Sequence, residues 1–112
     1  MTPALSQRQC QPCLENVPAL KGDDVQRLKE QLPAEWRIVK DQRLEKQFKF
    51  KDFKEALAFV NLVGEIAEHE NHHPDVYLAY GEVRIELWTH KIKGLSENDF
   101  ILAAKINSIH QK

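Results

Sequence analysis

The chain has 112 residues, which is the usual size of one domain. Hydrophobic residues make up 42% of it and charged residues 29%, a mixture typical of folded globular proteins rather than disordered ones. Sixteen basic and seventeen acidic residues leave a formal net charge of −1, so no basic excess predicts direct nucleic-acid binding. The longest apolar runs are a few residues, far short of the roughly twenty that a membrane span requires.

The first 21 residues are expected to form a loose arm ahead of a single domain over residues 22–112. Residues 1–11 lack the apolar stretch of a secretory signal, which favours a cytoplasmic location. The arm carries both cysteines of the chain, Cys10 and Cys13, as a lone C-x-x-C. One such pair supplies only two of the four ligands of a structural zinc site, and it lies in a polar, proline-containing stretch. We therefore expect no metal or redox role for it.

The first elements of the domain are predicted to be a short helix and a hairpin. Residues 22–24 offer an N-cap for the helix, and Pro33 ends it. Residues 36–40 then have the composition of a strand, residues 41–43 of a turn, and residues 44–50 alternate between apolar and polar side chains. This pattern is typical of two antiparallel strands joined by a turn.

The strongest helical pattern covers residues 53–71 and follows Asp52 as N-cap. Its apolar residues recur at the spacing of one helix face, at Phe53, Ala56, Leu57, Val60, Val63, Gly64 and Ala67. A second apolar row consists of Phe59, Leu62 and Ile66. That row indicates either another buried face, such as a subunit contact, or a helix set deep in one core.

Pro74 disfavours helix at the residue before it, and two more strands are predicted beyond it. They cover residues 76–80 and 83–90, with a tight turn at Gly81 and Glu82. Alternation in the second strand separates two faces. One face carries Val83, Ile85, Leu87 and Thr89, and the other carries Arg84, Glu86, Trp88 and His90.

Ser96 is predicted to cap the last helix, and Asp99 follows at close to the spacing of a capping box. The element order is then α-β-β-α-β-β-α. This order predicts an α+β fold, with a four-stranded antiparallel sheet and helices packed on one face. Because an open sheet edge can pair with a second strand, we expect a dimer through a strand edge.

Three of the five histidines, His69, His72 and His73, lie within five residues at the end of the long helix. All three could share a face if the helix extends that far. With Glu68 they could bind a metal, and as imidazoles they could donate and accept protons near neutral pH. A histidine there could also simply stabilise the C-terminal end of the helix.

His90 is a fourth candidate from a distant segment. It shares the predicted strand face with Trp88, so it could line a groove if another element covers that face. Asp99, at the start of the last helix, could orient His90 instead of merely capping.

These residues together resemble the pterin-4a-carbinolamine dehydratases, over about residues 22–110. The matching residues are Glu68-x-x-x-His72-His73-Pro74, Tyr80, Thr89-His90, Gly94-Leu95-Ser96 and Asp99. The bacterial branch of the family is the more similar one. Animal members tend to have a tryptophan soon after the proline, where Val76 stands here.

The resemblance implies a lyase with the α+β fold predicted above. Aromatic amino-acid hydroxylases leave their tetrahydropterin cofactor as a 4a-hydroxy adduct, and the dehydratase removes water from it to give quinonoid dihydropterin. Members of the family assemble as dimers or tetramers. The resemblance implies no metal and no organic cofactor, because the pterin is the substrate.

By the same resemblance, the candidate catalytic residues are His72, His73 and His90. One group must protonate the leaving hydroxyl and another must accept a ring proton. His73 and His90 are the favoured pair, and His72 is expected to position the hydroxyl or the ring. The residues expected to bind or orient the substrate or the imidazoles are Glu68, Pro74, Thr89 and Asp99.

Two other functions are kept open. The row of Phe59, Leu62 and Ile66 could bind a protein partner, since animal relatives dimerise a homeodomain transcription factor through a helix surface. Alternatively, His69, His72 and His73 could make the chain a small metalloprotein, which metal analysis of the purified protein would reveal.

Overall fold

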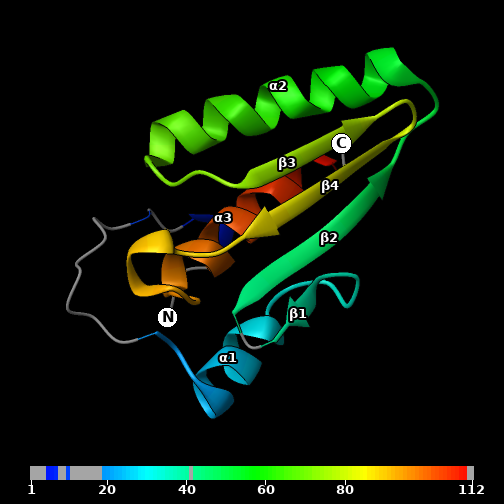
Figure 1. Ribbon diagram of the computed structural model, residues 1–112. Coiled ribbons are helices and arrows are strands. Elements are labelled where there is room, and N and C mark those ends of the chain that lie inside the picture. The colour runs from blue at the N-terminus through cyan, green and yellow to red at the C-terminus, as the bar shows by residue number, and fades with distance from the viewer. Residues whose placement is uncertain (1–4, 8–9, 11–18, 41, 111–112) are drawn as a thin grey trace.

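The computed structural model describes residues 5–7, 10, 19–40 and 42–110, and it has the predicted element order (Figure 1). The helices are α1 (Gly22–Lys29), α2 (Phe53–Glu70) and α3 (Glu97–His110), the strands are β1 (Arg37–Val39), β2 (Arg43–Lys49), β3 (Asp75–Ala79) and β4 (Glu82–Leu87), and the 3₁₀ turns are η1 (Leu5–Gln7) and η2 (His90–Ile92). The order α-β-β-α-β-β-α and the α+β class are confirmed.

The four strands form one antiparallel sheet in the order β1-β2-β4-β3. The central pair runs from Leu44 opposite Leu87 to Lys49 opposite Glu82. This register is set by alternation, because the side chains of β4 that were predicted to share a face are buried together. Helices α2 and α3 pack against each other over the sheet, and α1 contacts α3 (Figure 1).

The core lies between this sheet and the two longer helices. Its largest fully buried side chains include Trp36, Phe48 and Phe100. The ring of Trp36 meets that of Phe48 edge-on at 6.0 Å between centroids, an arrangement that aromatic pairs favour. The predicted hairpin is therefore anchored by aromatic packing at its β1 end.

Several predicted boundaries move by a few residues. Helix α1 begins at Gly22 and ends at Lys29, so Asp23 lies in its first turn, where a negative charge is favourable, and does not cap it. Strand β4 ends at Leu87 and not at residue 90. Thr89 instead pairs with Gly94 in an isolated bridge that closes the loop between β4 and α3.

The described part of the N-terminal segment is packed on the domain, where the sequence predicted a loose arm. Leu5 is buried in the core, and η1 lies against α3. The backbone N–H of Cys10 donates to Oε1 of Glu70 at 2.8 Å, which joins this segment to the end of α2. Cys13 lies outside the described residues.

The second apolar row of α2 is divided between core and surface. Phe59 is buried and Ile66 is half-buried against the core, whereas 47% of Leu62 is exposed. The deep-core interpretation is therefore correct for Phe59, while Leu62 remains available at the surface. Among the described residues, no helix combines the length and apolar character that crossing a membrane requires.

Candidate active site

The end of α2 places two of the histidines outside the helix. Asn71 adopts a left-handed conformation with φ of 54°, and its backbone N–H donates to the carbonyl of Ala67, which terminates the helix. His72 and His73 consequently lie on the short connection to β3. The condition for His69, His72 and His73 to share one helix face is not met.

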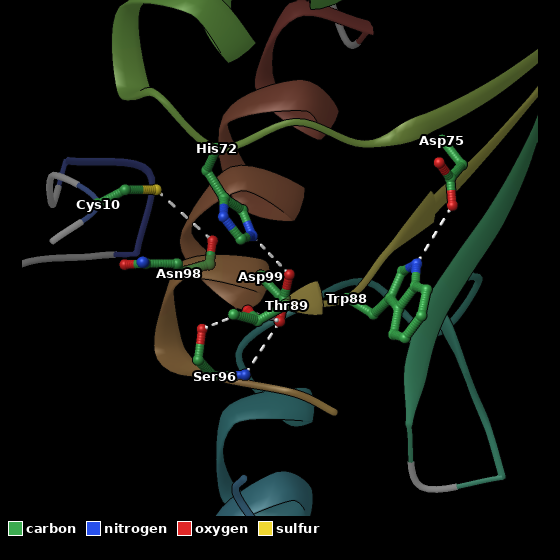
Figure 2. A network of polar contacts seen from close by, with 8 residues as sticks. All are labelled: Cys10, His72, Asp75, Trp88, Thr89, Ser96, Asn98 and Asp99. Atoms are coloured by element: carbon green, nitrogen blue, oxygen red, sulfur yellow. Dashed lines mark hydrogen bonds and ion pairs between the residues drawn. The ribbon is translucent and has the colours of Figure 1, made fainter. Parts of the chain in front are cut away.

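His72 is buried and is held by a residue of α3. Its Nε2 donates to Oδ1 of Asp99 at 2.6 Å, because an ionised carboxylate can only accept. Asp99 itself is fully buried. Figure 2 shows the imidazole pointing from the connection after α2 toward the first turn of α3. The contact fixes the orientation of the imidazole and commits its Nε2 to Asp99.

The second oxygen of Asp99 ties down the loop before α3. Oδ2 accepts from the hydroxyl of Thr89 and from the backbone N–H of Ser96, each at 2.9 Å. The hydroxyls of Thr89 and Ser96 also lie 2.8 Å apart (Figure 2). The bond from the Ser96 N–H is one half of the capping box that the sequence predicted. Asp99 thus both caps the helix and positions His72.

The sequence-based expectation that Asp99 orients His90 is wrong, because the carboxylate is occupied by His72. His90 is exposed at the start of η2, and its ring stacks on the indole of Trp88 with centroids 4.0 Å apart and an interplanar angle of 36°. The indole Nε1–H donates in turn to Oδ2 of Asp75 at 3.2 Å (Figure 2).

His73 has a carboxylate partner of its own. Its Nε2 lies in contact with Oε2 of Glu68, from the last turn of α2. Both side chains are exposed. Glu68 is therefore placed to orient this imidazole, which is one of the roles that the sequence suggested for it.

A pocket of about 330 Å³ brings the candidate residues together. Its walls include all three histidines, and its volume lies in the range of small-ligand sites. The other lining residues are Asn71, Pro74, Asp75, Trp88, Thr89 and Lys91. Glu68 and Asp99 stand behind their histidines and do not line the pocket. The segments before β3 and after β4 meet here because those two strands are neighbours in the sheet.

Asp75 and Trp88 are among the pocket residues that received no role from the sequence. Asp75 directly follows the proline of the matched motif, and Trp88 directly follows the last residue of β4. The β3–β4 pairing could have predicted that these two residues lie close together, because Asp75 lies opposite Glu86, two residues before Trp88. Tyr80, which belongs to the matched residues, is 70% exposed near the far end of β3 and does not line this pocket.

His69 lies apart from this site. Its Nδ1 is 2.9 Å from Oε2 of Glu70, and it borders a separate hollow between α2 and α3. His69, His72 and His73 thus contact three different carboxylates. Within the described ranges, no group of three histidine, cysteine or acidic side chains is arranged to hold a metal ion.

The thiol of Cys10 is hydrogen-bonded and partly buried. Its Sγ–H donates to the carbonyl of Asn98 at 3.6 Å. Burial raises the pKa of this thiol to about 12, and the nearby charge of Glu70 adds to the effect. Since the thiolate is the nucleophile and the metal ligand, Cys10 is poorly suited to either task.

Comparison with known sequences connects this geometry to a family. The family model described as Pterin 4 alpha carbinolamine dehydratase matches residues 18–109. A relative from Alkaliphilus metalliredigens (strain QYMF) that carries this family's name is 50% identical over 103 residues, which are 92% of this chain and 93% of the relative. Another, from Rubrobacter xylanophilus, is 48% identical over 105 residues, which are 94% of this chain and 97% of the relative.

Two solved structures of proteins described as pterin dehydratases or pterin dehydratase-like are similar to this one. A transcriptional coactivator/pterin dehydratase from Brucella melitensis is 32% identical with a TM-score of 0.77, over 82% of this chain and 98% of that one. A pterin dehydratase-like protein identified as a RuBisCO assembly factor in the alpha-carboxysome gives a TM-score of 0.59 over 70% of this chain and 92% of that one. At 22% identity, this second likeness shows the shared fold alone. The chain belongs to the pterin-4a-carbinolamine dehydratase family.

Proposed function

We propose that this protein is a 4a-hydroxytetrahydrobiopterin dehydratase, a hydro-lyase that converts a pterin-4a-carbinolamine to the quinonoid dihydropterin. The observation that carries the proposal is the convergence of His72, His73 and His90 on one pocket from two separate segments. Family membership supports the same reaction.

The reaction needs one proton donor and one proton acceptor. The C4a–O bond breaks as the leaving hydroxyl takes a proton and departs as water, while a ring N–H loses its proton to complete the new double bond. One imidazolium and one neutral imidazole supply this exchange, and the pair as a whole gains and loses no proton. Histidine suits both roles because its reference pKa is about 6.5.

The pocket distributes these roles among the three rings. His73 and His90 are exposed to the pocket, so they can exchange protons with a bound pterin and with solvent. His72 is buried and has one ring nitrogen committed to Asp99, which suits it to positioning the hydroxyl or the pterin ring. Glu68 fixes His73 by its contact with Nε2, leaving Nδ1 for the substrate.

Positioned acid–base groups accelerate proton transfers by about 10²–10⁴-fold. The carbinolamine already dehydrates unaided, so an acceleration of this size is enough for the reaction. The physiological setting we propose is the cytoplasm, where the product would be returned to the tetrahydropterin cofactor of an aromatic amino-acid hydroxylase.

The direct test is a stopped-flow assay on freshly made 4a-hydroxytetrahydropterin, following the loss of its ultraviolet absorbance with and without protein. Catalytic amounts of protein should accelerate the decay in proportion to their concentration. A decay equal to the unaided rate, with protein of native circular dichroism, would overturn the proposal.

We also propose that the protein is a homo-oligomer, as a dimer or tetramer. Strand β3 is an edge of the sheet. Exposed apolar side chains on β3 and α2 include Phe53, Leu57, Val76 and Tyr77. An open edge with apolar neighbours favours pairing with a second copy. Sedimentation should show a dimer or larger species at micromolar concentration, and a monomer alone would contradict the proposal.

A further inference from the structure

The three pocket histidines are held in place by different means. His72 and His73 each have a carboxylate partner, Asp99 and Glu68 respectively. Within the described part of the chain, the imidazole of His90 has no hydrogen-bonding partner, and its only ring contact is the stack on Trp88 at 4.0 Å. The orientation of His90 therefore depends on whatever fixes the indole.

The indole is fixed by Asp75. An indole has a single N–H donor, which points outward in the plane of the ring, so a bond to it restrains the plane as well as the position. Trp88 makes this bond to Oδ2 of Asp75 at 3.2 Å. Asp75 begins β3 and lies opposite Glu86 of β4, so the carboxylate stands on an element that is rigidly paired with the strand leading to Trp88.

We propose that Asp75 and Trp88 are positioning residues for His90, in which Asp75 fixes the plane of the indole and the indole fixes the plane of the imidazole. This inference rests on the proposed dehydratase function and adds two residues to its site. The Asp75–Trp88 pair orients the His90 ring by stacking, whereas Asp99 and Glu68 orient the other two histidine rings by hydrogen bonding.

The location of His90 explains why such support is needed. His90 opens the exposed turn η2. A side chain there without a fixed partner samples several rotamers, and only those that face the pocket can transfer a proton to the substrate. Stacking of aromatic rings shifts such a population by roughly threefold to tenfold. We expect the same range for the loss of kcat when the stack is released.

The first experiment separates the hydrogen bond of Asp75 from its charge. Asp75→Ala removes the acceptor and frees the indole, so kcat for dehydration should fall by roughly threefold to tenfold with a smaller change in KM. Asp75→Asn retains an oxygen that accepts from the indole N–H, so it should restore most of kcat. Asp23→Ala removes a carboxylate from the exposed first turn of α1, and this control should match the wild type.

A second variant protects the test against failure of Asp75→Ala to fold. Trp88→Phe keeps a flat ring but has no N–H to donate, so it should lose kcat to a similar degree as Asp75→Ala. Two results would overturn the inference. One is Asp75→Asn losing as much kcat as Asp75→Ala, which would assign the effect to the charge acting on the substrate. The other is wild-type kcat in both Asp75→Ala and Trp88→Phe.

The second experiment measures the position of the imidazole without using activity. A ring stacked on an indole has its carbon-bound protons shifted upfield by the ring current, and the His90 signals can be assigned by their loss in His90→Ala. In Asp75→Ala these NMR signals should move toward those of the exposed His69, and in Asp75→Asn they should stay near the wild-type positions. Unchanged His90 signals in Asp75→Ala would overturn the inference. Because no turnover is needed, this outcome is independent of whether the wild type proves to be a dehydratase.

Discussion

Nε2 of His72 and Oδ1 of Asp99 lie 2.6 Å apart at a buried position, although the two residues are 27 positions apart in the chain. The same carboxylate accepts from the Thr89 hydroxyl and the Ser96 N–H, so one side chain joins the connection after α2, the loop after β4 and the first turn of α3. The proposed site and the fold thus share one buried anchor.

Replacing this anchor should reduce both stability and activity. Asp99→Ala leaves the Thr89 hydroxyl, the Ser96 N–H and the His72 ring without their buried acceptor. The expected loss in the free energy of unfolding is about 3 kcal/mol, measured by urea denaturation. Asp99→Asn keeps one acceptor oxygen and should lose less. An unfolding free energy of Asp99→Ala within about 0.5 kcal/mol of the wild type would contradict this role.

The exposed histidines should behave in the opposite way, with large losses of activity and small losses of stability. His73→Ala and His90→Ala each remove a proposed proton-transfer group, so kcat should fall by about 100-fold or more for one or both. Their unfolding free energies should change by about 0.5 kcal/mol or less, because both side chains are exposed. His69→Ala, outside the pocket, is the matched control and should retain full activity. Wild-type turnover in the double variant His73→Ala/His90→Ala would reject their roles.

Local sequence patterns predicted the elements of the fold, but they did not predict where β4 ends, and that boundary matters for the site. Alternation along β4 predicted the buried face of Val83, Ile85 and Leu87. In the sequence the same alternation continues through Thr89, and aromatic and β-branched residues favour strands. The strand ends earlier because the loop closes through the Thr89–Gly94 bridge, with Lys93 at φ of 53°. A lysine gives no local sign of that conformation.

The partners of the histidines needed tertiary information. The spacing of Ser96 and Asp99 predicted a helix cap, and one capping bond is present. Nothing local indicated that the same carboxylate would meet His72, because that contact depends on how α3 packs beneath the connection after α2. The stack of His90 on Trp88 likewise required the turn after β4, since adjacent side chains on the same strand face would be farther apart than 4.0 Å.

A titratable ring against the core should make stability depend on pH. His110 packs edge-on against Phe48, with centroids 4.8 Å apart. The imidazole is exposed at one side, and its partial burial lowers its pKa below the ordinary 6.5, while the charge of Lys46 lowers it further. As pH falls below about 6.5, the unfolded chain therefore binds a proton before the folded one does, so acid shifts the equilibrium toward unfolding.

His110→Phe keeps an aromatic ring but removes its titration. The urea midpoint of the wild type should fall between pH 7.5 and pH 5.5 by more than that of His110→Phe. Above pH 7.5, where the ring is neutral in both the folded and the unfolded state, the difference between the two midpoints should no longer change with pH. An equal fall in the two proteins would show that other groups produce the acid sensitivity.

The thiol of Cys10 should resist alkylation in the folded protein. With its pKa raised to about 12, only a minute fraction is thiolate at pH 8, whereas an unperturbed cysteine with a pKa of about 8.5 is substantially ionised. Cys13→Ser leaves Cys10 as the only thiol. In that variant, the reaction with iodoacetamide should be on the order of a hundredfold slower in the native state than in urea. Equal rates would mean that Cys10 is released from Glu70 and Asn98 in solution, and that the N-terminal segment is not held against α2 and α3.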